Sequence, residues 1–285
     1  MASSQHRVFR VLWLGTDLLL KLTVLALLYT CAWEFSVRQY LRGFSNAIVP
    51  IEAAPEKKVE AILDWMRVGP ARSQPSPPEG LAQRDPETTL NHQELLRVCG
   101  TATNAFLNLA RSGGLSVRRL LLLSPDRRAK HVVAEVLIDE RWVIVDPAYR
   151  IILRDAHGRL LTRKDLQDPE TFRQATNGIP GYLPEYNYDR FAHVRLARLP
   201  LEGLHLRDVL DAIHPGWDEL IDWSLVLERE SFAVLVLIIV FLAFLLGLRI
   251  VLGWYATRGL PAARFSLNIR LFGISPDPFS RPGIN

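Results

Sequence analysis

The sequence predicts an α+β domain carried between two membrane-spanning helices. An apolar run near each end of the chain is long enough, at about 1.5 Å of rise per residue, to cross a bilayer core of roughly 30 Å. Between residues 91 and 150, apolar residues at helical spacing are followed by strand patterns and a hairpin. The expected core is therefore a helix packed on an antiparallel sheet.

The first run, residues 1–33, is interpreted as a retained N-terminal transmembrane anchor, with a cleaved signal peptide as the alternative. Asp17 and Lys21 lie inside this run, four residues apart, so on a helix they share a face and can pair. Because charges are costly to place in lipid, the pair is a candidate contact for a partner helix.

The second run, residues 231–255, is uncharged from Phe232 to Leu248 and predicts a second transmembrane helix rather than a buried core helix. A short basic tail, residues 256–285, follows it. We therefore expect two contacts with the lipid bilayer, one at each end of the chain.

The formal net charge of +4 is unevenly distributed, because residues 34–230 contain 26 basic and 28 acidic residues. The excess of Lys and Arg lies at the two ends, and such residues concentrate on the cytoplasmic side of spanning helices. We expect both termini in the cytoplasm and residues 34–230 on the outer side of the cell (inner) membrane. No basic patch with interleaved aromatic residues indicates nucleic-acid binding.

The domain at 34–230 begins with two distinct segments. Residues 56–66 predict an amphipathic helix with four apolar side chains on one face, namely Val59, Ile62, Leu63 and Met66. Residues 69–90 are rich in Pro, Gly and Ser and predict a surface loop, either a passive linker or a lid over a cleft.

Cys99 opens a segment of helical spacing that ends on Gly113-Gly114, as helices commonly do. It is thus expected at a helix N-terminus, where the macrodipole favours the thiolate. The other cysteine, Cys31, lies in the predicted anchor. A lone cysteine is usually a small buried hydrophobe, but an unpaired thiol in an oxidising compartment favours a catalytic role.

Residues 115–125 predict a strand, and residues 131–147 predict a hairpin that turns at Asp139-Glu140. The numbers of residues paired across this turn add up to 279, so Asp146 faces Val133 and lies diagonal to His131 on the same face. The opposite face carries only apolar side chains: Val132, Ala134, Val136, Ile138, Val143 and Val145.

Cys99, His131 and Asp146 together have the composition of a nucleophile, base and orienter set. Cysteine chemistry needs an imidazole within about 2.6–3.2 Å, and a carboxylate on the far ring nitrogen fixes the tautomer. Each residue alone has a structural explanation as core, strand or turn. Their order and predicted geometry favour the catalytic interpretation.

These residues resemble the motifs of the transglutaminase-like superfamily, which has a papain-like fold. The segment CGTATNAFLNLARSGG and the hairpin HVVAEVLIDERWVIVDP follow that family's order of Cys, His and Asp motifs, across about residues 91–150. The resemblance implies Cys99 as nucleophile, His131 as general base and acid, and Asp146 as its orienter. A thiol enzyme of this class needs neither a metal nor a cofactor.

The chain departs from the family pattern beside the cysteine. Many members have Gly two residues before it and an aromatic residue after it, where this chain has Arg97 and Gly100. The oxyanion hole is also unassigned. The backbone N–H of Cys99 is the natural donor, and the candidates for an oxyanion or substrate contact are Asn91, Gln93 and Trp142.

Two further segments allow two interpretations each. The basic cluster at residues 118–130 is either a solvated face or a cleft rim that favours an anionic substrate. The aromatic stretch at 184–195, with Tyr186, Tyr188 and His193, either lines a substrate groove or packs in the core.

The sequence as a whole predicts a membrane-anchored, thiol-dependent acyl-transfer enzyme with a peptide or glycan-peptide substrate. Attack of water on the thioester would make it a peptidase or amidase, which we favour, and attack of an amine would make it a transglutaminase-type transferase. The alternative from another class is a catalytically inactive binding or scaffold module of an envelope assembly.

Overall fold

A computed structural model describes residues 2–70, 83, 85–194, 206–220 and 222–259. The chain divides into two compact units. One comprises Met1–Ala32 with Val234–Asn285, and the other comprises Trp33–Ala233.

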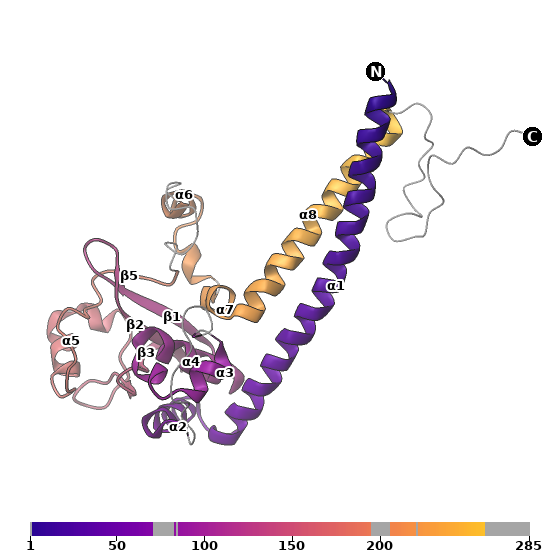
Figure 1. Ribbon diagram of the computed structural model, residues 1–285. Coiled ribbons are helices and arrows are strands. Elements are labelled where there is room, and N and C mark those ends of the chain that lie inside the picture. Colours follow the sequence, from indigo (N-terminus) through magenta and orange to yellow (C-terminus); the bar gives the residue numbers. More distant parts are fainter. Residues whose placement is uncertain (1, 71–82, 84, 195–205, 221, 260–285) are drawn as a thin grey trace, which may run out of the picture. The chain divides into compact units, whose positions relative to one another are not determined.

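The first unit consists of parts of two helices, α1 (Ala2–Ile48) and α8 (Glu230–Gly259) (Figure 1). Both are long and apolar enough to cross a membrane. The expected pair forms, because Lys21 Nζ lies 2.8 Å from Asp17 Oδ2. Asp17 also lies 3.3 Å from Arg249 Nη2, so α8 of the same chain provides a partner helix for this carboxylate. The predicted anchor continues without a break to Ile48.

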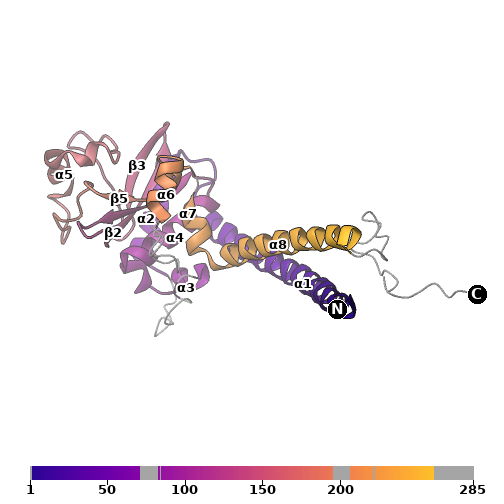
Figure 2. The same cartoon turned by 90° about the horizontal axis from the view of Figure 1, so that it is seen from above.

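The second unit is built on a five-stranded sheet of order β4-β3-β2-β1-β5, in which all pairs are antiparallel (Figures 1 and 2). The strands are β1 (Val117–Leu123), β2 (Ala129–Ile138), β3 (Arg141–Asp146), β4 (Ile151–Ile152) and β5 (Phe191–Ala192). The helix α4 (Cys99–Ser112) packs on one face of the sheet. This arrangement is the α+β fold that the sequence predicts.

The β2–β3 hairpin has the predicted turn and the predicted register. Asp139 and Glu140 both have positive φ, 46° and 61°, as a two-residue type I′ turn requires. Ala134 pairs with Val145, in agreement with the expected sum of residue numbers. All six apolar residues predicted for one face are buried against α4 or its neighbours.

The layer around α4 contains α2 (Pro55–Val68), in which the four residues predicted to be buried are buried. It also contains α3 (Pro86–Asn91) and the 3₁₀ turn η2 (Leu95–Arg97). The expected loop at 69–90 is therefore wrong over its last residues, because the Asp85 carboxylate accepts from Thr88 N–H and starts a helix at Pro86. The remainder of that loop, 71–82 and 84, lies outside the described residues.

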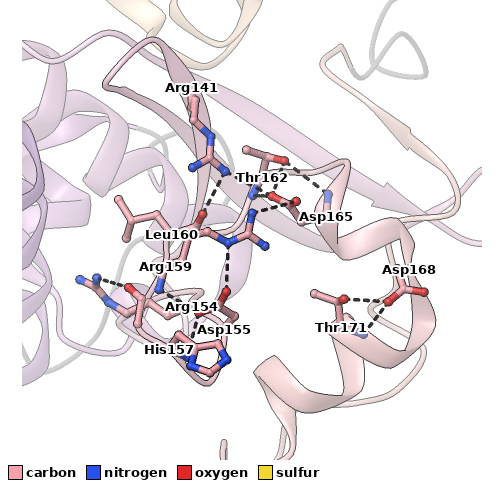
Figure 3. Close-up of polar contacts among 11 residues, drawn as sticks. Arg141, Arg154, Asp155, His157, Arg159, Leu160, Thr162, Asp165, Asp168 and Thr171 are labelled. Carbon is pink, nitrogen blue, oxygen red and sulfur yellow. Dashed lines mark hydrogen bonds and ion pairs between the residues drawn. The ribbon is translucent and has the colours of Figure 1, made fainter.

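The opposite face of the sheet is covered as well, by the segment between β4 and β5 with η3 (Asp165–Gln167) and α5 (Pro169–Thr176). Carboxylates fix the turns of this segment (Figure 3). Asp155 accepts from the N–H groups of His157 and Arg159, each at 2.9 Å. Asp165 and Asp168 accept from Thr162 and Thr171 in the same way. Both faces of the sheet are therefore buried.

The last elements of this unit are α6 (Leu206–Ile213), η6 (Trp217–Glu219) and α7 (Trp223–Glu228). Arg111 near the end of α4 lies 2.6 Å from Asp222, which caps α7. This ion pair attaches α7 to the cysteine-bearing helix.

Glu140→Gly is expected to stabilise the chain by about 1 kcal/mol, since glycine adopts the left-handed conformation without the steric cost of a Cβ atom. In a domain of this size that corresponds to a rise in Tm of about 2–4 °C, measurable by thermal unfolding of the full chain in detergent. Glu140→Ala is the matched control and gives no such rise. A lower Tm for Glu140→Gly would contradict the strain assigned to this turn.

Candidate active site

Cys99 is the first residue of α4, as predicted. Val98 before it is extended, and the Thr101 hydroxyl donates to the backbone oxygens of Leu95 and Val98, which helps to define the helix start. Thr103, one turn after Cys99, donates to Val132 O at 3.0 Å and so fixes α4 to β2. The thiol of Cys99 is free and half-buried. It therefore lies where backbone N–H groups favour a thiolate.

His131 and Asp146 meet as the hairpin register predicts, with Nε2 and Oδ2 2.6 Å apart and both side chains buried. The other carboxylate oxygen, Oδ1, accepts from the backbone N–H groups of Ala148 and Tyr149 at 3.1 and 3.3 Å. Since Nε2 is engaged by Asp146, the remaining ring nitrogen, Nδ1, is the one available to the Cys99 thiol, whose pKa is lowered chiefly by its interaction with His131. The three predicted residues thus form one polar chain, in which His131 and Asp146 are directly hydrogen-bonded.

Electrostatics in this chain favour a thiolate beside an imidazolium. The hydrogen bond with His131 lowers the pKa of Cys99, against the opposing effect of burial. Burial on its own lowers the pKa of His131, but the hydrogen bonds with Asp146 and Cys99 outweigh it and raise that pKa to about 9. Both shifts widen the pH range between the two pKa values, in which the ion pair is present.

The three candidate oxyanion or substrate residues are placed differently. Asn91 Nδ2 donates to Glu87 O at 2.9 Å and reaches Tyr40 Oη at 3.5 Å. Trp142 carries the guanidinium of Arg118 over its ring, 4.2 Å from the centroid. Gln93 packs against Gly69, where its side chain comes within 3.0–3.1 Å of the position that a Cβ atom would occupy. Asn91 and Trp142 thus make contacts with other protein groups, and the oxyanion or substrate roles of all three residues stay predictions.

The basic cluster at 118–130 does not act as one surface. Arg118 is buried and pairs with Glu135, while Arg119 is buried and donates to Gly100 O at 3.2 Å. Arg127 and Arg128 lie in the exposed turn before β2. The prediction of a common rim for an anionic substrate is therefore wrong for Arg118 and Arg119, because both are buried and their charged groups bind partners inside the domain.

The aromatic stretch divides between the core and the imidazole of His131, and its role in a substrate groove stays a prediction. Tyr188 is fully buried in the core on the His131 face, and His193 is buried 2.9 Å from Glu135. Tyr186 instead stacks on the imidazole of His131, with ring centroids 4.3 Å apart and an interplanar angle of 11°. Tyr149 and Tyr182 approach the same imidazole edge-on. Sequence reasoning missed these two.

Arg150 is a third residue that sequence reasoning missed, and its positive φ of 57° gives no signal in the sequence. Its guanidinium donates to three backbone oxygens: Ala148 at 2.9 Å, Leu96 at 3.2 Å and Met66 at 3.3 Å. These oxygens belong to the segment after Asp146, the segment before Cys99, and α2. One side chain thus ties the cysteine-bearing and aspartate-bearing segments together.

The site combines a cysteine at the N-terminus of a helix with a histidine and an aspartate on the antiparallel sheet on which that helix packs. This combination is typical of thiol–imidazole–carboxylate domains. Residues 42–147 match the family model of the transglutaminase-like superfamily, and the chain contains a domain of that superfamily there. The match includes Cys99, His131 and Asp146 and ends before Tyr149, Tyr182 and Tyr186. No curated protein and no solved structure matches the chain significantly.

Alkylation of Cys99 is expected to follow an inflection below the ordinary thiol pKa of about 8.5. His131→Ala moves that inflection above the ordinary value, because the hydrogen bond is lost while burial still disfavours the thiolate. The rate of iodoacetamide modification against pH measures this in the full chain carrying Cys31→Ser. A chain that carries both Cys31→Ser and Cys99→Ser supplies the background, and identical profiles with and without His131 would refute the assignment.

Proposed function

We propose that the chain is a membrane-anchored enzyme that transfers acyl groups from amide bonds through Cys99. The observation that carries this proposal is the polar chain of Cys99, His131 and Asp146, in which Asp146 is hydrogen-bonded to His131 at 2.6 Å and the interaction with His131 lowers the pKa of the Cys99 thiol. It contains the nucleophile, the proton carrier and the orienting group that acyl transfer requires.

In the first half-reaction, the Cys99 thiolate attacks the carbonyl carbon of an amide and forms a tetrahedral intermediate. The C–N bond then breaks, and the leaving amine takes the proton held on His131 Nδ1, which leaves a thioester on Cys99 and a neutral imidazole. Asp146 on Nε2 keeps the ring oriented throughout. The backbone N–H of Cys99 and the side-chain amide of Gln93 are the candidate donors to the oxyanion.

In the second half-reaction, neutral His131 removes a proton from the attacking group, and the thioester bond breaks to regenerate the thiolate and the imidazolium. With water the product is a carboxylic acid, and with an amine it is a new amide. We favour hydrolysis, because Cys99 is only half-buried and water is therefore not excluded from it. The chain is then a peptidase or amidase.

The place of action follows from the charge distribution. Basic residues predominate outside 34–230, and the two helices that could cross a membrane lie at the ends of the described chain. We propose that the catalytic domain lies outside the cytoplasmic membrane with both termini inside, and that its substrates are peptides or glycan-peptides of the cell envelope.

The proposal is tested with p-nitrophenyl acetate as an activated acyl donor and the full chain in detergent. We expect a burst of nitrophenol, an acetyl group on Cys99 in the intact mass, and a loss of turnover by about 10³-fold or more in Cys99→Ser and His131→Ala. Asp146→Asn is expected to lower turnover by about 10²–10⁴-fold, because it disturbs the orientation of the imidazole.

Asp168→Asn makes the same chemical change at a surface helix cap, where Asn serves as well as Asp, and is the matched control. An added primary alkylamine separates hydrolysis from transfer, since a transferase diverts the acetyl group to the amine whereas a hydrolase releases acetate. If no burst occurs and Cys99 stays unacylated, the result supports the alternative of an inactive binding module. The departures from the family pattern at Arg97 and Gly100 favour this alternative.

A further inference from the structure

The segment between α5 and β5, residues 177–190, places its tyrosines against the His131–Asp146 pair. This segment lies beyond the residues that match the family model. It is attached near both ends, because Gly181 O accepts from Tyr149 Oη at 2.6 Å and Asn187 Oδ1 accepts from Lys130 Nζ at 2.9 Å. The tyrosines it carries are therefore held in place over His131 by contacts independent of their rings.

Tyr186 covers one face of the imidazole. The near-parallel stack, 4.3 Å between centroids, presents the negative face of the phenol ring to a ring that carries positive charge when protonated. Tyr182 and Tyr149 stand at 6.1 Å and 5.9 Å, nearly perpendicular to the imidazole. An imidazolium in this position is attracted to Tyr186, whereas a neutral imidazole gains less from the stack.

Tyr182 offers a hydroxyl to the other member of the pair. Its oxygen is buried and, among the residues that the structure describes, has no hydrogen bond of normal geometry. Burial, and after it the neighbouring Tyr188 and Asp146, raise the pKa of Tyr182, so the hydroxyl keeps its proton. A carboxylate has about four acceptor positions. On Asp146 three are occupied, by His131, Ala148 and Tyr149, and one remains.

We propose that Tyr186 and Tyr182 are positioning residues of the site, the first by stacking on the imidazolium of His131 and the second by donating its hydroxyl proton to the open acceptor position of Asp146. This inference deepens the proposed function, because it concerns the same polar chain. The stack stabilises the imidazolium and thereby favours the thiolate of Cys99 over the neutral thiol. The hydroxyl of Tyr182 acts through Asp146, because it holds the carboxylate in the orientation in which it stabilises the imidazolium.

The ionisable groups that face His131 are Cys99 from α4, Asp146 from β3, Tyr149 after β3, and Tyr182 and Tyr186 from residues 177–190. Between the acid and alkaline limbs of the alkylation profile, the rate reports the fraction of molecules with the proton on His131 rather than on Cys99. In this pH range near neutrality the rate forms a plateau. The height of this plateau therefore measures the effect of each tyrosine without any substrate.

The experiment measures iodoacetamide modification of Cys99 against pH in the full chain carrying Cys31→Ser. We expect Tyr186→Leu to lower the ratio of ion pair to neutral pair by about 3- to 30-fold, the range from an exposed to a desolvated cation–π contact, so that the plateau falls and the lost amplitude moves to the alkaline limb. Tyr186→Phe keeps the ring and recovers most of the plateau. Tyr182→Phe removes only a hydroxyl and lowers the plateau by several-fold.

Tyr40→Phe removes a hydroxyl on α1 that takes no part in this chain of contacts and is the matched control. Plateaus in Tyr186→Leu and Tyr182→Phe that equal that of Tyr40→Phe would overturn the inference, even if p-nitrophenyl acetate acylates Cys99. If the plateaus fall as expected while no acylation occurs in the parent chain, the positioning roles hold and the proposed function fails.

Discussion

The buried hydrogen bond between His131 and Asp146 is the contact on which the candidate site depends. The two side chains are 3% and 0% exposed, and such a pair is tolerated away from water only when its remaining polar positions are satisfied. Two backbone N–H groups after Pro147 satisfy Asp146 Oδ1, and the Cys99 thiol is the polar group that interacts with the imidazole from α4. One pair therefore fixes the turn after β3 and the point at which α4 meets the sheet.

The sequence could predict this pair because its geometry is local. A two-residue turn and a period of two fix the register of the hairpin, and with it the diagonal contact. The second apolar layer could not be predicted in the same way. Four strand residues on the His131 face, Leu120, Leu122, Val133 and Ile144, contact side chains such as Phe172 and Tyr188 in a turn-rich segment without periodicity. The positions of Tyr182 and Tyr186 depend on these non-local contacts.

The far end of α4 is fixed as firmly as its beginning. Ser45 Oγ donates to Leu109 O at 3.1 Å, and Lys58 Nζ donates to Gly113 O at 3.0 Å, so α1 and α2 satisfy carbonyls that a helix C-terminus leaves open. Arg111 adds the ion pair with Asp222. A helix held at both ends cannot shift along its axis without breaking several contacts, and its first residue, Cys99, keeps its distance from the imidazole.

A second buried histidine–carboxylate pair, on the same face of the sheet, shows what distinguishes the first. His193 Nε2 lies 2.9 Å from Glu135, but that carboxylate also accepts from Arg118 Nε at 2.5 Å, so a permanent cation balances its charge. The other nitrogen of His193 faces a carboxylate, Asp218, at 3.9 Å. Such a pair joins β1, β2 and η6 and holds the fold together. At His131 the second nitrogen meets the N-terminal thiol of a helix, and that difference makes the first pair the candidate for acyl chemistry.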